Sequence, residues 1–399
     1  MDFKLTEEQQ LLKQEFVDFF AEEMKHAPLE YKKGTLEAIY GTEEGFAFHK
    51  AMQKKLAAKG WLTMEWPVEY GGKGAPIIEQ LIFSEVLAYH RAPGIDQFGL
   101  KMFAPTLMLF ANDEQKKRLL PPIAKGEVNY CQGWSEPNAG SDLASLRTTA
   151  IRGGDHYIVN GQKVWTTGAH RADCMFLLAR TNTSEKRSKG LSVFYVDMNT
   201  PGIEVRPIHY MDGTHLYNEI FFNEVRIPAS DRIGAENEGW NSTRQTMNFE
   251  RSGIGNIIAT KRGLEELFEY AKTTKRGGKY LYENLGVRQK LARLFIDVER
   301  GRALAYRAAW NQEKGNLVFS PALASESKVF GTELIQRWAN FGSEIMGLFG
   351  QLEESSWAPL NGIIPYSYQG CMGGNIAAGS SEIQRNIIAW VGVQLPRFP

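Results

Sequence analysis

The chain has 399 residues, of which 43% are hydrophobic and 23% are charged, so it holds enough apolar material for a large core and two or three domains. Lysine plus arginine and aspartate plus glutamate both total 46. This balance lacks the basic excess typical of proteins that bind nucleic acid or anionic membrane surfaces, so neither is expected as a partner.

The hydrophobic periodicity changes twice along the chain. Apolar residues recur at helical spacing in residues 1–126, strand-like runs fill 127–235, and long helical runs return in 236–399. We therefore predict three domains with these boundaries. The predicted fold class is α+β, with an N-terminal helical domain, a central β-barrel or β-sandwich domain and a C-terminal helical bundle.

Local patterns predict individual elements within these segments. Asn160-Gly161 separates two strand-like runs and predicts a type I′ hairpin turn, because both residues tolerate a positive φ. The strand after this turn would carry Trp165 and Thr167, whose side chains would then point to one face. Further strands are expected at 174–179, 191–196, 203–207 and 219–227, and long helices at 242–272, 285–310 and 322–348.

Cysteine usage and the start of the sequence bear on the compartment. Cys131, Cys174 and Cys371 are far apart in sequence, which indicates reduced thiols. The first residues are polar and charged, unlike a secretory signal, and no stretch approaches the roughly 20 apolar residues of a membrane-spanning helix. We expect a cytoplasmic protein. The seven histidines show no ligand spacing, so no metal is expected.

Several strings of residues occur in an order that matches the three segments. They are Trp66-Pro67-x-Glu69-Tyr70-Gly71-Gly72-x-Gly74, the stretch 115–126 with Leu120-Pro121, Trp134-Ser135-Glu136-Pro137-Asn138-Ala139-Gly140-Ser141-Asp142, Gly161-Gln162-Lys163-Val164-Trp165-Thr166-Thr167-Gly168 and Gly379-Ser380-Ser381-Glu382-Ile383-Gln384-Arg385-Asn386-Ile387-Ile388. By these strings the chain resembles the acyl-CoA dehydrogenase family from end to end. The resemblance implies an FAD-dependent enzyme that desaturates an acyl-CoA thioester between its α and β carbons.

The resemblance also implies which residues bind FAD. In this family the segment from Ser135 to Ser141 lies along the flavin and its pyrophosphate, where small residues let backbone amides approach an anion. Trp165 lies against the isoalloxazine, and the hydroxyl of Thr167 lies near N5. Without this context the segment would be a polar turn and Trp165 a core aromatic. The residues expected to bind the cofactor are Gln132, Trp134, Ser135, Gly140, Ser141, Trp165, Thr166, Thr167, Arg276, Ser380 and Glu382.

The catalytic base departs from the commonest family pattern. Many members carry a glutamate directly before the glycine of the last string, but this chain has Ala378 there. In a subset that includes isovaleryl-type, long-chain-type and steroid or cyclic acyl-CoA dehydrogenases, the glutamate precedes an arginine on another helix, which here is Glu250. Gly253, one helical turn away, would leave room for substrate. An exposed glutamate or an ion pair is the alternative for Glu250.

The remaining contacts follow from the same resemblance. Arg251 is expected to contact CoA, and the amide of Ala378 to hydrogen-bond the thioester oxygen, with Ser141 and Gly379 also at the substrate. Two motifs on the adenine side of the cofactor are weakened, since Arg276-Gly277-Gly278 and residues 344–348 differ from the usual strings. Arg276 is the candidate for the missing arginine.

The resemblance implies electron-transfer flavoprotein as the electron acceptor and a homotetramer as the assembly. Two alternatives stay open. An acyl-CoA oxidase or flavin monooxygenase on the same scaffold would reoxidise its flavin in air. A heterotetramer with a paralogue would complete the flavin site from two different chains. The sequence leaves the acyl group undetermined.

Overall fold

The computed structural model describes residues 4–28, 31, 36–185, 187–249, 253–315 and 320–396. The chain divides into two compact units that alternate along the sequence. The helical unit comprises Met1–Gly34, Ala75–Ala92 and Arg251–Pro399, and the sheet unit comprises Thr35–Gly74 and Pro93–Glu250. Helices flank a strand-rich segment in sequence, which confirms the α+β class. The predicted boundaries after residues 126 and 235 stay a prediction.

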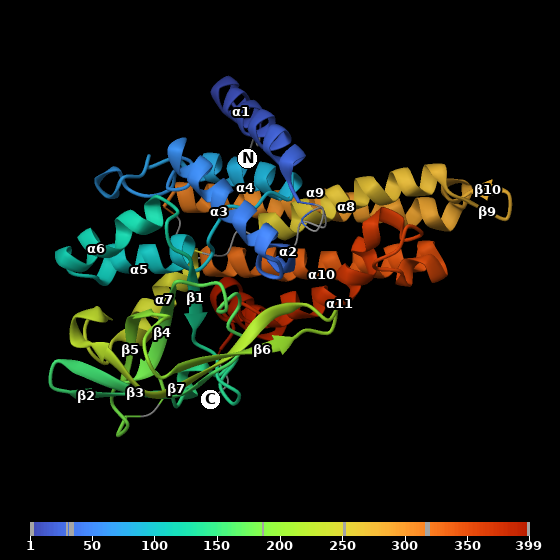
Figure 1. Cartoon of the computed structure of the whole chain (residues 1–399). Helices are drawn as coiled ribbons and strands as arrows, with labels where there is room; N and C mark the ends of the chain where they lie inside the picture. The colour runs from blue at the N-terminus through green and yellow to red at the C-terminus, as the bar shows by residue number, and fades with distance from the viewer. Residues whose placement is uncertain are drawn as a thin grey trace. The chain divides into compact units, whose positions relative to one another are not determined.

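The helical unit is built on three long helices, α8, α9 and α10, which pack side by side (Figure 1). Leu267 of α8, Val298 of α9 and Leu334 of α10 are fully buried in their common core. The elements of this unit are α1 Glu7–Glu23, η1 Met24–His26, α4 Ile77–Tyr89, α8 Ile254–Thr273, β9 Lys275–Arg276, β10 Lys279–Tyr280, η7 Leu281–Glu283, α9 Leu285–Glu313, α10 Ser320–Met346, η8 Gly347–Gln351, η9 Pro359–Gly362, α11 Ile363–Ile376, α12 Ser381–Ile387 and η10 Ile388–Gly392.

Polar side chains at the helix starts explain where these helices begin. The Thr6 hydroxyl accepts a hydrogen bond from the Gln9 amide, and the Gln9 side chain accepts one from the Thr6 amide, so α1 opens with a capping box. Asn284 accepts from the amides of Gly286 and Val287 and starts α9 in the same way. These caps satisfy amides that have no partner within the helix.

The helix predicted over residues 242–272 is two helices. In the sheet unit α7 spans Gly239–Phe249, and in the helical unit α8 begins at Ile254. Gly253 has φ +65° and precedes α8 as its N-cap, so it lies outside any helix. A Cβ on Gly253 would approach Ser327 of α10 at 2.7 Å. Gly253 therefore permits close packing against α10, and the expectation that it leaves room for substrate is wrong.

The sheet unit combines short helices with eight strands of one sheet. Its elements are α2 Leu36–Tyr40, α3 Glu43–Ala58, η3 Val68–Tyr70, η4 Gly99–Phe103, α5 Ala104–Phe110, α6 Asp113–Ala124, β1 Tyr130–Gly133, η5 Leu143–Ser145, β2 Thr149–Gly153, β3 His156–Lys163, β4 Cys174–Arg180, β5 Leu191–Asp197, β6 Ile203–His209, β7 His215–Pro228, η6 Ala229–Asp231, β8 Arg232–Ile233 and α7. The four strands predicted from residue 174 onward correspond to β4, β5, β6 and β7, and each predicted end lies within 4 residues of the observed end.

The strand order is β6-β7-β3-β2-β4-β5-β8, with β1 beside β4. Most neighbours are antiparallel, as expected for a domain of short consecutive strands, but β1 and β2 each pair parallel with β4. All seven residues of β4 are buried, so this strand is covered on both faces. The strand that leads into Trp134 therefore lies beside the most deeply buried strand of the unit.

The hairpin turn predicted at Asn160-Gly161 is wrong. Both residues lie inside β3, and the hairpin between β2 and β3 turns at Gly154 and Asp155 instead. The register of β3 against β7 shifts between Val159 and Gly161, because β7 advances by three residues where β3 advances by two; the extra residue of this β-bulge therefore lies in β7, where Glu224 has φ +51°. Gly161, with φ +147°, permits a close approach of chains, since a Cβ there would lie 2.7 Å from the Cα of Thr148.

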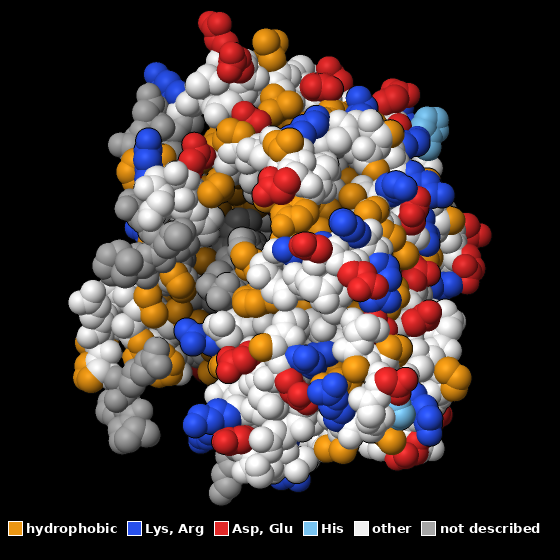
Figure 2. All heavy atoms as spheres, turned by 90° about the vertical axis from the view of Figure 1, so that its left-hand side faces the viewer, with side chains coloured by type: hydrophobic (Ala, Val, Ile, Leu, Met, Phe, Trp, Pro, Cys, Tyr) orange, Lys and Arg blue, Asp and Glu red, His pale blue; other side chains and the backbone are white. Residues whose placement is uncertain are grey.

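The described surface agrees with the balanced composition. Figure 2 shows acidic and basic side chains interspersed over the face that it presents. None of the described helices combines the length and apolarity needed to cross a bilayer. The three cysteines are buried thiols. Among the described residues no group of three or more histidine, cysteine, aspartate or glutamate side chains is arranged to hold a metal ion.

Candidate functional site

The segment after β1 forms a compact turn in which Ala139 is buried and the next two small residues are exposed. Trp134 is 4% exposed, and Gln132 precedes it within β1. The amides of Glu136 and Ala139 each donate to the other residue's carbonyl, which closes the turn. Gly140 and Ser141 follow at the surface, and a Cβ placed on Gly140 would meet nothing within 4 Å. The backbone of this segment is therefore open to a ligand.

The second predicted flavin segment leaves the sheet before Trp165. Strand β3 ends at Lys163, and Trp165 has φ +59°, a strained conformation for a bulky residue. The alternation from which a common face for Trp165 and Thr167 was inferred is thus absent. Trp165 is 55% exposed, whereas Thr166 is fully buried. The backbone amide of Thr166 donates to the Asn218 carbonyl of β7, and the Thr166 carbonyl accepts from the side-chain amide of Asn218.

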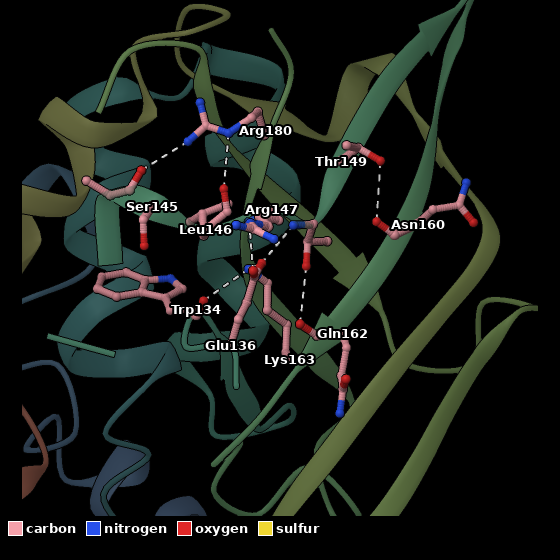
Figure 3. Close-up of polar contacts among 12 residues, drawn as sticks. Trp134, Glu136, Ser145, Leu146, Arg147, Thr149, Asn160, Gln162, Lys163 and Arg180 are labelled. Atoms are coloured by element: carbon pink, nitrogen blue, oxygen red, sulfur yellow. Dashed lines mark hydrogen bonds and ion pairs between the residues drawn. The ribbon is translucent and has the colours of Figure 1, made fainter. Parts of the chain in front are cut away.

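A direct bond and a buried ion pair join these two segments. The amide of Val164 donates to the carbonyl of Ser135 at 2.9 Å. The ammonium of Lys163 donates to the Trp134 carbonyl at 3.0 Å and to Oε1 of Glu136 at 2.9 Å (Figure 3). Lys163 and Glu136 were quoted within the sequence strings but were not predicted as site residues. One signal in the sequence could have identified Lys163: in an alternating strand it occupies a position expected to be buried, where an unpaired lysine is rare.

The two members of this ion pair respond differently to burial. Burial lowers the pKa of Lys163 to about 8, even though Glu136 acts in the opposite direction. Burial raises the pKa of Glu136, but the Lys163 ammonium and hydrogen bonds from Thr148 and Arg147 outweigh it and hold that pKa below its ordinary value. The Glu136 carboxylate thus keeps its charge because it accepts hydrogen bonds from Lys163 and from the amides of Arg147 and Thr148.

The C-terminal string forms a second strained loop, in the helical unit. Ala378 has φ +52° and Gly379 has φ +81°, between the end of α11 and the start of α12. The Lys328 ammonium donates to the carbonyls of Gly374 and Gly379, and the Gln384 amide donates to the Ala378 carbonyl. Within the described part of the chain, the amide of Ala378 has no hydrogen-bond acceptor. That amide can therefore meet an oxygen of a ligand.

Glu382 lines an open groove in the helical unit, and Ser380 lies just before the helix that carries Glu382. The Ser380 hydroxyl accepts from the Ile383 amide and caps α12. Behind it, residues of α10, α11 and α12 line a groove of about 430 Å³, which includes Asn375, Ser381 and Glu382. Two buried oxygens at this groove, Asn375 Oδ1 and Ser381 Oγ, have no hydrogen-bond partner among the described residues. Such orphaned atoms are typical of a surface that binds a polar ligand.

Arg276 lies in a tight hairpin at the far end of α8. The turn residues Gly277 and Gly278 both have positive φ, which explains the Gly-Gly pair. The Arg276 guanidinium donates to the Ile345 carbonyl at 2.8 Å, in the last turn of α10. Arg276 thus meets the weakened 344–348 segment, and it also caps the C-terminal end of a helix, a structural role in its own right.

Glu250 and Arg251 lie outside the described residues, in the connection between α7 and α8. The described neighbours on either side are Phe249, at the end of α7, and Gly253. The argument that placed Glu250 and Gly253 on one face of a single helix fails, because Gly253 has φ +65° and is the N-cap that precedes α8.

Comparison with known proteins decides the family. The chain matches the acyl-CoA dehydrogenase N-terminal domain over residues 6–127, the middle domain over 131–225 and the C-terminal domain over 237–392. The chain belongs to the acyl-CoA dehydrogenase family. It is thus a flavoprotein oxidoreductase that depends on FAD and dehydrogenates an acyl-CoA thioester.

Relatives of this dehydrogenase match over its full length. It is 34% identical to the acyl-CoA dehydrogenase FadE26 of Mycobacterium tuberculosis over 403 aligned residues, which cover 100% of this chain and 99% of the relative. The structure of the ChsE4-ChsE5 complex from the same species matches at 34% identity and a TM-score of 0.87, with 100% of both chains covered. The structure of the Tcur3481-Tcur3483 steroid ACAD matches at 30% identity and a TM-score of 0.89, again over 100% of both chains.

The residues of this acyl-CoA dehydrogenase fit a flavin nucleotide. Trp134 Nε1 and Thr166 Oγ1 are buried polar atoms that lack a hydrogen-bond partner within the described ranges. Both belong to the segments that the family resemblance assigns to FAD. A buried donor without a partner costs free energy, and a ligand with oxygen and nitrogen acceptors would relieve that cost.

Replacing Thr166 by valine tests this fit. We expect FAD to dissociate about three to ten times faster from the variant holoenzyme, because one hydrogen bond contributes about 0.5–1.5 kcal/mol. The unfolding midpoint should stay near that of the wild type, because the hydroxyl makes no bond within the described protein. Flavin fluorescence after dilution measures the release. Thr106→Val is the matched control, since the Thr106 hydroxyl is buried but bonded to its own helix. Unchanged release from Thr166→Val would remove this hydroxyl from the flavin site.

Proposed function

We propose that this chain removes an α-proton and a β-hydride from a saturated acyl-CoA, with Glu250 as the base. The reaction needs a carboxylate for the weakly acidic α-C–H and a polarised thioester carbonyl. Bound FAD supplies the hydride acceptor at N5. The observation that carries the proposal is Ala378, which leaves the commonest position of the base without an acid in a chain that matches the family throughout.

The position of Glu250 in sequence supports its role. It follows the last residue of α7, Phe249, and precedes Arg251 in the order found in the family subset with the alternative base. Apolar surroundings would raise the pKa of its carboxyl toward the operating pH, so that the carboxylate can accept a proton from carbon and still release it later.

The loop around Ala378 is suited to polarise the thioester. We propose that its backbone amide donates a hydrogen bond to the carbonyl oxygen, which gains negative charge as the α-proton leaves. Support comes from the absence of an acceptor for this amide in the described chain and from the bonds of Lys328 and Gln384 to neighbouring carbonyls. A donor held before the substrate arrives loses little free energy on reorganisation.

The other predicted residues have binding roles in this proposal. Arg251 contacts the CoA portion, and Ser141 and Gly379 contact the thioester end of the substrate. The flavin contacts are those of Gln132, Trp134, Ser135, Gly140, Ser141, Trp165, Thr166 and Thr167 in the sheet unit and Arg276, Ser380 and Glu382 in the helical unit. The Arg276 hydrogen bond to Ile345 leaves its other guanidinium nitrogens available to a phosphate.

Substitution of Glu250 by glutamine tests the base. We expect bound FAD to be retained, and the rate of flavin bleaching by substrate to fall by about 100-fold or more, since loss of a general base costs about 10²–10⁴ in rate. Anaerobic stopped-flow absorbance measures both. Glu265→Gln on α8 is the control and should bleach normally, because the Glu265 carboxylate accepts a hydrogen bond from Tyr89 at the protein surface. Normal bleaching of Glu250→Gln would show that another group takes the proton.

The acyl group requires a substrate panel. Gly255 of α8 is exposed, and a Cβ there would meet nothing within 4 Å, but this opening favours no particular chain. The similarity to a structure named as a steroid dehydrogenase gives a reason to include steroid thioesters beside straight, branched and aromatic ones.

We propose electron-transfer flavoprotein as the electron acceptor. After anaerobic reduction by substrate, the flavin should reoxidise slowly in air and rapidly when electron-transfer flavoprotein is added, as monitored by visible absorbance. Rapid reoxidation by oxygen alone would instead favour the acyl-CoA oxidase alternative.

We propose a homotetramer of four 45.0 kDa chains, with a heterotetramer as the second candidate. The ChsE4-ChsE5 structure, by its name a complex of two different proteins, is the observation that favours the second. Expressed alone, a homotetrameric chain should elute in gel filtration at about four times its own mass with about one FAD per chain. A colourless chain that binds FAD only after coexpression with a paralogue would support the heterotetramer.

A further inference from the structure

The strongest unassigned feature is the buried pair formed by Glu136 and Lys163. The Lys163 side chain is completely buried and the Glu136 side chain is 8% exposed. A buried ion pair is poor evidence for a stabilising role, because well-packed apolar residues in its place are often as stable or more so. The geometry of this pair instead points to control of local conformation.

The pair joins three separate segments of the sheet unit. From the end of β3, the Lys163 ammonium donates to the Trp134 carbonyl and to the Glu136 carboxylate. The carboxylate also accepts from the amides of Arg147 at 2.7 Å and Thr148 at 2.8 Å, just before β2. Glu136 therefore receives donors from two segments while its own backbone forms the turn after Trp134.

Each end of the pair lies next to a strained or orphaned group. Lys163 is followed closely by Trp165, whose φ is +59°, and by Thr166, whose buried hydroxyl has no partner in the described ranges. Glu136 is followed by the open backbone of Gly140 and preceded by Trp134, whose indole nitrogen is likewise orphaned. The pair thus connects the segment that contains Trp134 with the segment that contains Thr166, and each segment has a buried polar atom that a ligand could bond.

Arg180 forms hydrogen bonds to the part of the chain that follows the Trp134–Ser141 segment. Its guanidinium donates to the carbonyls of Leu146 at 3.1 Å and Ala144 at 3.0 Å, as well as to the loop before β5. In Figure 3 the side chains of Glu136 and Lys163 point toward each other, and Arg180 approaches from β4. Two cations therefore bond to this part of the chain, Lys163 within the Trp134–Ser141 segment and Arg180 at Ala144 and Leu146 just after it.

We propose that Glu136 and Lys163 are positioning residues for the flavin, which hold the Trp134–Ser141 and Trp165–Thr167 segments in register without touching the cofactor. This inference rests on the proposed assignment of the two segments to FAD. Since the pair bonds to the backbone of one segment and precedes the other in the same strand, its loss would change the spacing between them. FAD would then be held less tightly even in a fully folded protein.

The test compares Lys163→Met, Glu136→Gln and the double variant as full-length holoenzymes. Two quantities are measured, namely the unfolding midpoint by far-ultraviolet circular dichroism in excess FAD, and the rate of FAD release by flavin fluorescence on dilution. The visible spectrum of the bound flavin reports its surroundings. Lys163→Met leaves a buried carboxylate unpaired, so we expect it both to unfold earlier and to release FAD about tenfold faster or more.

The double variant separates positioning from stability. It contains no unpaired charge, so its unfolding midpoint should return toward that of the wild type. We expect its FAD release to stay about tenfold faster, and its flavin spectrum to stay altered, because the bonds from Lys163 are still missing. Recovery of both stability and FAD release in the double variant would overturn the proposal. Should Lys163→Met fail to fold, Glu136→Gln and the double variant decide the question.

Two controls make the outcome specific. Arg118→Met breaks another ion pair of the sheet unit, with the buried Asp231, which contacts neither flavin segment, and should release FAD at the wild-type rate. Thr166→Val distinguishes the two levels of the argument. If Thr166→Val speeds FAD release but the pair variants do not, the positioning role is wrong while the flavin assignment stands. If none of them alters release, the flavin assignment itself is wrong.

Discussion

The buried bond between the Lys163 ammonium and the Glu136 carboxylate is the interaction on which the local arrangement of the sheet unit depends. A fully buried cation is costly, as its lowered pKa shows, and it is retained where one group must satisfy several acceptors from different segments. Here it connects the end of β3 to the turn after β1, while the carboxylate draws in the start of β2. No neutral side chain of similar size supplies three donors from one atom.

In the helical unit, too, a buried lysine donates hydrogen bonds to the backbone carbonyls of a loop. Lys328, 9% exposed, donates to the carbonyls of Gly374 and Gly379, on either side of the strained residue Ala378. In both units a lysine from regular structure bonds to a loop, and a non-glycine residue at positive φ lies nearby: Ala378 lies within the loop that Lys328 contacts, and Trp165 follows Lys163 itself two residues later. Strain of this kind persists only where neighbouring bonds overdetermine the backbone, and it is common at binding sites.

Two glycines, Gly161 and Gly253, have structural roles that differ from those expected from their neighbours in sequence. Asn160-Gly161 has the composition of a hairpin turn, but both residues lie within β3, where Gly161 permits the close approach of Thr148. Gly253 looked like an opening beside a helix face, but it ends the break between α7 and α8 and allows approach to Ser327. In each case the structural role of the glycine depends on a neighbour that is distant in sequence. Hydrophobic periodicity is a local pattern and does not predict which distant residue that is.

The sequence by itself determined the family, the FAD dependence and the helix-strand-helix order, because motifs and hydrophobic periodicity are properties of short stretches. The residues that bind the cofactor stay a prediction from the resemblance. Only the tertiary structure decided four features: the division into two units that alternate along the chain, the capping of α10 by Arg276, the Glu136–Lys163 bond, and an Ala378 amide that has no acceptor among the described residues. The physical reason is that burial creates these features. A lysine in a polar string is an ordinary solvated side chain until the surrounding strands remove its water and leave it only protein acceptors.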